Sequence, residues 1–164
     1  MKFVLLAILI QALSANAQSK LDVKISEATK HMVCPLPDEM NPVTLNAQAI
    51  NEGDSIGIIV KVAMAPGWHI YAYVPSGQPY IAIDQILQVP ENCKTVGEWK
   101  KTEPSASSDA PGVLIYEEEA VFIHKLVKLP QAKMDGIVKA GLYYQTCNLR
   151  QCLPPRGKTF ELRY

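Results

Sequence analysis

Apolar and polar residues alternate in short runs through most of the chain after residue 42, and this period of two predicts β-strands. In the segment 43–49 every second residue is apolar, 51–54 has the composition of a turn, and 55–64 is a second β-rich run. These features predict a β-hairpin. Further strands are predicted at 68–73, 80–89, 113–116, 120–129, 137–145 and 159–164.

The segments between these runs indicate how the strands are arranged. They are short and rich in Pro, Gly and Asn, as in Pro66-Gly67 and Pro111-Gly112. No segment of helical period separates the strands, so a parallel βαβ sheet has little support. The spacing therefore predicts an all-β domain, an antiparallel β-sandwich, over residues 43–164. Residues 105–112, which are rich in Ser, Ala, Pro and Gly, are predicted to form a loop.

The N-terminal region differs from the rest in composition. Lys2 is followed by an apolar run from Phe3 to Ile10 and by Ala15-Asn16-Ala17, the small-x-small pattern of a signal peptidase site. The apolar run is shorter than the roughly 20 residues that span a bilayer. We therefore predict a signal peptide at residues 1–17, cleaved after Ala17, and a soluble exported chain. Residues 18–42 mix charges with three prolines and are predicted to form an irregular segment rather than a helix.

The balance of charges along the chain limits the classes of binding partner that we expect. The 16 basic and 16 acidic side chains balance at neutral pH, and no stretch gathers many like charges. An extended surface for nucleic acid or for an anionic membrane is therefore not expected, and proteins are the expected partners.

Four cysteines in an exported chain suggest two disulfides. Cys147 and Cys152 bracket four residues between two predicted strands, and paired strands place facing Cα atoms about 4.5 to 5.5 Å apart, within the range that a disulfide needs. A disulfide between Cys34 and Cys93 would close a loop of about 60 residues and contribute about 4 kcal/mol, against about 2 kcal/mol for the short loop. The short disulfide is thus the better candidate for reduction in use, and Cys34 and Cys93 are either a structural disulfide or two buried thiols.

Other chemistries fit less well. Structural zinc sites usually use two closely spaced pairs of ligands. This chain has only one closely spaced cysteine pair, so a zinc site with His31, His69 or His124 as further ligands is not expected. No Gly-x-Ser-x-Gly elbow or phosphate loop is present. We expect no metal and no organic cofactor. From spacing alone, Cys147–Cys152 is either a structural clip or a redox pair, and basic residues close in sequence (Arg150, Arg156 and Lys158) favour the redox pair because positive charge stabilises a thiolate.

Two motifs carry a family resemblance. The segment Tyr144-Gln145-Thr146-Cys147 with Cys152-Leu153-Pro154-Pro155, preceded by Pro66-Gly67-Trp68-His69-Ile70-Tyr71, resembles the N-terminal periplasmic domain of the thiol:disulfide interchange protein DsbD. The resemblance implies an immunoglobulin-like sandwich whose two cysteines carry reducing equivalents from a membrane electron transporter to thioredoxin-fold proteins of the periplasm.

The resemblance also implies roles for single residues. Cys152 would form the mixed disulfide with a partner and Cys147 would resolve it. His69 and Tyr71 fall where the family has tyrosines near the disulfide, and a histidine there would make exchange depend on pH near neutrality. Trp68, Tyr144 and Arg150 complete the set of residues expected around the cysteines.

The chain departs from the family pattern in three respects. Four residues rather than five separate the cysteines. The family shields its disulfide with a cap loop that carries an aromatic residue. Residues 105–112, which correspond to this loop, contain no aromatic residue. The family's transmembrane and thioredoxin-like parts are absent from this sequence, so the membrane electron transporter is expected to be a separate polypeptide. The sequence thus predicts a periplasmic component of thiol-disulfide interchange, a protein-disulfide reductase in type. The alternative is an exported immunoglobulin-like binding or assembly module with structural disulfides.

Overall fold

The computed structural model describes residues 20–130 and 135–164, so the predicted signal peptide at 1–17 lies outside the described residues. A helix covers residues 20–31. The strands of the described chain are β1 (Val43–Glu52), β2 (Ser55–Met64), β3 (His69–Tyr73), β4 (Asp84–Gln88), β5 (Cys93–Lys101), β6 (Ser105–Ala106), β7 (Leu114–Glu117), β8 (Glu119–Lys128), β9 (Ile137–Tyr144), β10 (Thr146–Cys147) and β11 (Arg156–Arg163).

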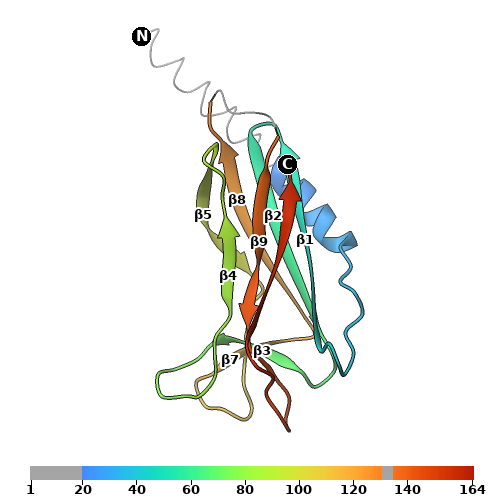
Figure 1. The fold of residues 1–164 in the computed structure, drawn as a ribbon, viewed down its shortest axis with the longest axis vertical. Coiled ribbons are helices and arrows are strands. Elements are labelled where there is room, and N and C mark those ends of the chain that lie inside the picture. Colours follow the sequence, from blue (N-terminus) through green and yellow to red (C-terminus); the bar gives the residue numbers. More distant parts are fainter. Residues whose placement is uncertain (1–19, 131–134) are drawn as a thin grey trace.

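Two antiparallel sheets form the sandwich, with strand orders β1-β2-β8-β5 and β11-β9-β4 (Figure 1). The predicted hairpin is confirmed, because β1 pairs with β2 from Val43 opposite Met64 to Glu52 opposite Ser55. Alternate residues of β2 and β9 point between the sheets and are fully buried, among them Ile58, Val60 and Leu142. The period of two in the sequence is therefore the signature of this core.

A third sheet, of order β10-β3-β7-β6, lies at the end of the sandwich opposite the C-terminus (Figure 1). Its short strands are continued by loops that extend beyond the two main sheets. Cys147 belongs to β10, at the edge of this sheet. The third sheet therefore holds the cysteine at one end of a rigid core.

The expectation of an irregular segment at residues 18–42 is wrong for residues 20–31, which are helical. Leu21, Ile25, Ala28 and Met32 recur at helical spacing and pack against Ile59 on the outer face of β2. The prolines that argued against a helix begin only at residue 35, beyond the helix end, and residues 32–42 are irregular as expected. None of the helices in the described portion is long and apolar enough to cross a bilayer.

The other strand predictions are confirmed with shifted ends, and three strands, β5, β6 and β10, were not predicted. The predicted strand at 80–89 is shorter, and the one at 159–164 begins earlier, as β4 and β11 show. β5 was missed because it is an edge strand with mostly exposed, Lys-rich positions and a bulge between Val96 and Lys100, so it lacks apolar alternation. Residues 105–106 of the predicted loop form the short strand β6.

Cys34 and Cys93 are not bonded to each other, so the alternative of two buried thiols is correct. The Cys34 thiol donates to the carbonyl oxygen of Lys61, which pairs with Val121 of β8. Cys93 pairs with Lys128 near the other end of β8. At about 3.3 Å per residue, the two cysteines lie roughly 20 Å apart along the sheet, far beyond disulfide reach.

Candidate redox site

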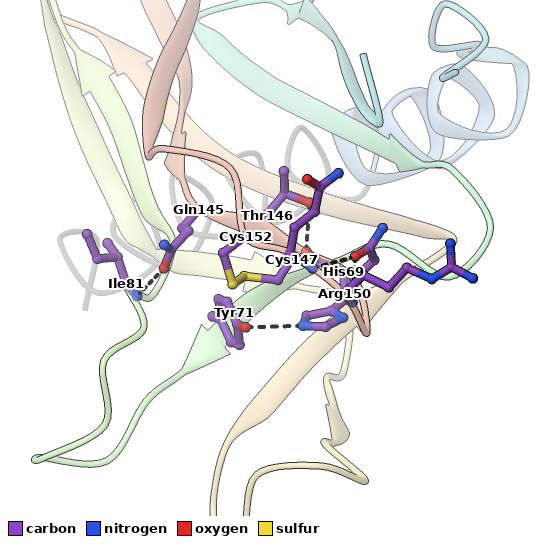
Figure 2. Close-up of a disulfide and its surroundings, with 10 residues drawn as sticks. His69, Tyr71, Ile81, Gln145, Thr146, Cys147, Arg150 and Cys152 are labelled. Carbon is purple, nitrogen blue, oxygen red and sulfur yellow. Dashed lines mark hydrogen bonds between the residues drawn. A yellow bond between two sulfur atoms is a disulfide. The ribbon is translucent and has the colours of Figure 1, made fainter. Parts of the chain in front are cut away.

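The structure joins Cys147 and Cys152 in a disulfide (Figure 2). The two residues form an isolated antiparallel bridge with their Cα atoms 4.0 Å apart. This separation is slightly shorter than the distance expected for paired strands. The sequence prediction of a disulfide across a hairpin-like connection is confirmed.

Asn148 organises the turn between the cysteines. Its side-chain oxygen accepts hydrogen bonds from the backbone N–H groups of Arg150 and Gln151, each at 2.9 Å. The backbone N–H of Asn148 donates to the carbonyl of Gln151, and that of Leu153 donates to the carbonyl of Thr146. Side chains of Asn commonly cap a turn in this way. These bonds link the backbone of the turn independently of the sulfur-sulfur bond.

Residues just before Cys147 fasten it to the rest of the fold. The buried Thr146 hydroxyl donates to the carbonyl of His69 at 2.9 Å, which adds a side-chain bond to the pairing of β10 with β3. The side-chain oxygen of Gln145 accepts from the backbone N–H of Ile81 at 2.9 Å (Figure 2). The Gln-Thr pair before the cysteine therefore fixes both the strand and a neighbouring loop.

A cavity of about 190 Å³ opens at the disulfide. Its walls come from β3, the cysteine turn and two loops, and are formed by His69, Tyr71, Tyr80, Ser107, Asp109, Ala110, Cys147, Asn148, Leu149 and Cys152. The two cysteines are not equally accessible. Cys147 is only 2% exposed, whereas Cys152 belongs to the exposed residues. An attacking group from another molecule therefore reaches Cys152 first.

Three rings form the aromatic wall of this cavity. The His69 Nε2 and the Tyr71 hydroxyl are joined by a hydrogen bond of 3.2 Å (Figure 2). The Tyr71 ring stacks on that of Tyr80, with centroids 4.6 Å apart. Burial, with a smaller effect from Tyr80, raises the pKa of Tyr71 to about 12, so this phenol stays protonated at neutral pH.

Burial lowers the pKa of His69 below its ordinary 6.5, and the carboxylates of Glu117 and Asp109 oppose this shift with smaller effects. The residue pairs with Glu117 of β7 on one side and with Cys147 of β10 on the other. A neutral imidazole is the favoured form at pH 7. The site thus surrounds its disulfide with neutral groups and the carboxylate of Asp109.

Other sequence-predicted residues lie elsewhere. Trp68 is buried in the wall of a separate cavity beside Cys34, and Tyr144 is buried in the main core. Arg150 is exposed, and Figure 2 shows its side chain extending away from the sulfur atoms. None of these three residues lines the cavity at the disulfide.

The basic side chains expected to favour the thiolate have other contacts. The Arg156 guanidinium donates to the Tyr144 hydroxyl at 3.0 Å and to the carbonyl of Val43. Lys158 lies over the ring of Phe160. Closeness in sequence to the cysteines did not predict closeness in space, because Arg156 and Lys158 belong to β11 and their side chains contact the body of the sandwich.

The loop at 105–112 does reach the disulfide, since Ser107, Asp109 and Ala110 line the cavity. It supplies no aromatic side chain, as the sequence indicated. The aromatic side chain that stacks on Tyr71 in this cavity comes instead from Tyr80, in the segment between β3 and β4. Nothing in the local sequence around Tyr80 pointed to the site, because its position depends on the loop folding back onto β3.

Asn148 and Gln145 were also missed as site residues. The signal that could have found Asn148 is an Asn directly after a cysteine in a turn of four residues. As for a metal, the part of the chain that the structure describes brings together no group of three or more His, Cys, Asp or Glu side chains able to hold one.

A pH dependence of stability follows from His69. Because its pKa in the folded chain is below the ordinary 6.5, the unfolded chain binds more protons as the pH falls from 6.5 to the lowered value, and stability falls over that window. We expect urea unfolding at pH 7.5 and pH 5 to show a smaller loss of stability on acidification in His69→Gln than in the wild type. Equal losses in the two proteins would contradict the assignment.

Comparisons with known proteins bear on this site. A family model, the N-terminal region of the thiol:disulfide interchange protein DsbD, matches residues 35–163. No curated protein sequence matches the chain.

Among solved structures, the reduced N-terminal domain of Neisseria meningitidis DsbD matches with a TM-score of 0.50 and 20% identity, over 84% of this chain and 96% of that one. The N-terminal periplasmic domain of Proteus mirabilis ScsB matches with a TM-score of 0.49 and 20% identity, over 79% of this chain and 49% of that one. A complex of the DsbD and PilB N-terminal domains from Neisseria meningitidis matches with a TM-score of 0.44 and 19% identity, over 77% and 85% of the two chains. The predicted all-β, immunoglobulin-like antiparallel fold is confirmed.

Proposed function

This chain belongs to the family of N-terminal domains of the thiol:disulfide interchange protein DsbD, which acts in thiol-disulfide exchange, and on that basis we propose that it is a periplasmic redox carrier. It cycles Cys147 and Cys152 between disulfide and dithiol. The observation that carries the proposal is the disulfide itself, closed across a turn that hydrogen bonds hold independently, with one cysteine exposed and the other buried.

Reduction of the carrier proceeds in two exchanges. A thiolate of the donor dithiol attacks the sulfur of Cys152, forms a mixed disulfide with it and releases Cys147 as a thiolate. The second donor thiolate then attacks the donor's own sulfur in the mixed disulfide and releases Cys152. The carrier gains two electrons and, on protonation, two protons, while the donor becomes a disulfide.

Delivery of the electrons follows the reverse order. The Cys152 thiolate attacks an acceptor disulfide and forms a mixed disulfide, with release of one acceptor thiolate. Cys147 then attacks the sulfur of Cys152, which closes the carrier disulfide and releases the reduced acceptor. The buried position of Cys147 beside Cys152 suits this resolving step, because no other molecule competes for it.

The partners follow from the family. We propose thioredoxin-fold proteins as acceptors and a separate membrane thiol-electron transporter as the source. A DsbD N-terminal domain from Neisseria meningitidis forms a complex with the N-terminal domain of PilB. The proposed location is the periplasm, reached by way of the predicted signal peptide at residues 1–17.

The test is whether the disulfide is reducible in the folded protein. We expect dithiothreitol and purified reduced thioredoxin to free Cys147 and Cys152, as mapped by alkylation and mass spectrometry, while circular dichroism stays native. Because the closed loop is short, its loss costs about 2 kcal/mol, which corresponds to a fall of about 4–8 °C in Tm for a domain of this size. A disulfide that opens only when the domain unfolds would refute the carrier and favour a structural clip in a binding module.

A further inference from the structure

The turn that joins the two cysteines presents an apolar side chain to solvent. Leu149 is 84% exposed, although it lines the same cavity as the disulfide. The hydrogen bonds of Asn148 to the N–H groups of Arg150 and Gln151 fix the backbone on both sides of Leu149. A single exposed leucine is ordinary on a protein surface. The informative feature here is its fixed position beside an exposed cysteine.

The geometry of a mixed disulfide determines what must cover this leucine. A disulfide brings the Cβ atoms of its two cysteines to about 3.8 Å from each other. A protein bonded to Cys152 therefore places its surface against the turn that contains Leu149, three residues earlier in the sequence. Cys147 is buried, whereas Cys152 and Leu149 are both exposed and line the same cavity, so a partner bonded to Cys152 lies within reach of Leu149.

We propose that Leu149 is the apolar anchor on which a thioredoxin-fold partner docks before sulfur exchange, and that Asn148 is the positioning residue that holds it there. The inference rests on the proposed function, since it assumes attack at Cys152. The occupant is the apolar surface that surrounds the partner's reactive cysteine. Burial of an exposed leucine at the centre of such a contact is favourable, and a small reductant, which buries no surface, gains nothing from it.

The test compares two reductants on the same disulfide. Second-order rate constants for reduction of the oxidised protein are measured with purified reduced thioredoxin and with dithiothreitol, for the wild type and for Leu149→Asn. Because docking precedes exchange, we expect Leu149→Asn to lower the thioredoxin rate about tenfold and to leave the dithiothreitol rate within about twofold. Leu149→Met, which keeps the apolar surface, is expected to retain the wild-type rate with thioredoxin.

Leu36 provides a matched control. It is 92% exposed and lines a different cavity, beside Trp68, so Leu36→Asn should leave both rates unchanged. A thioredoxin rate for Leu149→Asn within twofold of the wild type would overturn the docking role and leave the carrier function standing. Equal losses with both reductants, or an equal loss in Leu36→Asn, would also overturn it. A wild-type disulfide that dithiothreitol reduces in the folded protein but thioredoxin does not would overturn the docking role alone. A wild-type disulfide that neither reductant opens in the folded protein would overturn the proposed function and this inference together.

Discussion

The Cys147→Ser variant is expected to trap a partner as a mixed disulfide, whereas the Cys152→Ser variant is expected to abolish exchange. In Cys147→Ser the exposed Cys152 still attacks or is attacked, but no second sulfur is present to resolve the mixed disulfide. In Cys152→Ser the remaining thiol is 2% exposed and out of a partner's reach. We expect this variant to lose about a thousandfold or more of the exchange rate, as is typical when a nucleophile is removed.

The measurement is capture of a thioredoxin variant that keeps only its attacking cysteine. Cys147→Ser is activated as a mixed disulfide with a small aromatic thiol, and the complex is separated without reductant and identified by mass spectrometry through the Cys152 peptide. Cys152→Ser, treated identically, is the control. The free thiols of Cys34 and Cys93 are present in both variants and are buried, so they contribute equally. Equal capture by the two variants would contradict the assignment of Cys152 as the exposed partner sulfur.

Alanine at Gly141 is expected to destabilise the sandwich by about 3 kcal/mol. Gly141 lies in β9 opposite Thr159 of β11. A Cβ atom there would overlap the carbonyl oxygen of Lys158 and lie 2.7 Å from the Cα of Thr159. Both are backbone atoms in a paired strand, so relief requires the two strands to move apart.

Gly157 supplies the control on the same strand pair. A Cβ atom at Gly157 would meet side-chain atoms of Tyr143 and Ile86 at 3.6 and 3.8 Å, which is ordinary contact. Thermal unfolding by circular dichroism should show Gly141→Ala melting about 6–12 °C below the wild type, and Gly157→Ala within about 2 °C of it. If both variants melt together, the close approach of β9 and β11 is not what requires glycine at position 141.

How far the sequence predicted the fold depended on burial. β1, β2 and β9 are buried on the face between the sheets. Alternation identified β1, and β-branched or aromatic runs identified β2 and β9. β5 lies at an edge with exposed lysines and gave no apolar signal. The helix at 20–31 was missed although Leu21 and Ile25 stand at helical spacing, because the nearby prolines were given more weight than they have beyond a helix end.

The residues expected at the site also divide into those that the structure places beside the disulfide and those that it places elsewhere. The spacing of Cys147 and Cys152 and the motif around them predicted the disulfide, and the resemblance placed His69 and Tyr71 beside it, where the structure has them. Trp68 and Tyr144 belong to the same motifs but serve other cavities and the core, since adjacent residues of a strand point to opposite faces. The sequence motifs therefore contain more residues than can face the disulfide, because side chains alternate between the two faces of a strand.

The sequence by itself determined most of the strand pattern, the family and the identity of the paired cysteines, because these depend on local periodicity and on residues close together in the chain. Only the tertiary structure decided that Cys147 is buried while Cys152 is exposed, that Tyr80 joins the site from a distant loop, and that Cys34 and Cys93 stay apart. These properties arise when strands remote in sequence are packed side by side, and exposure and distance are fixed by that packing.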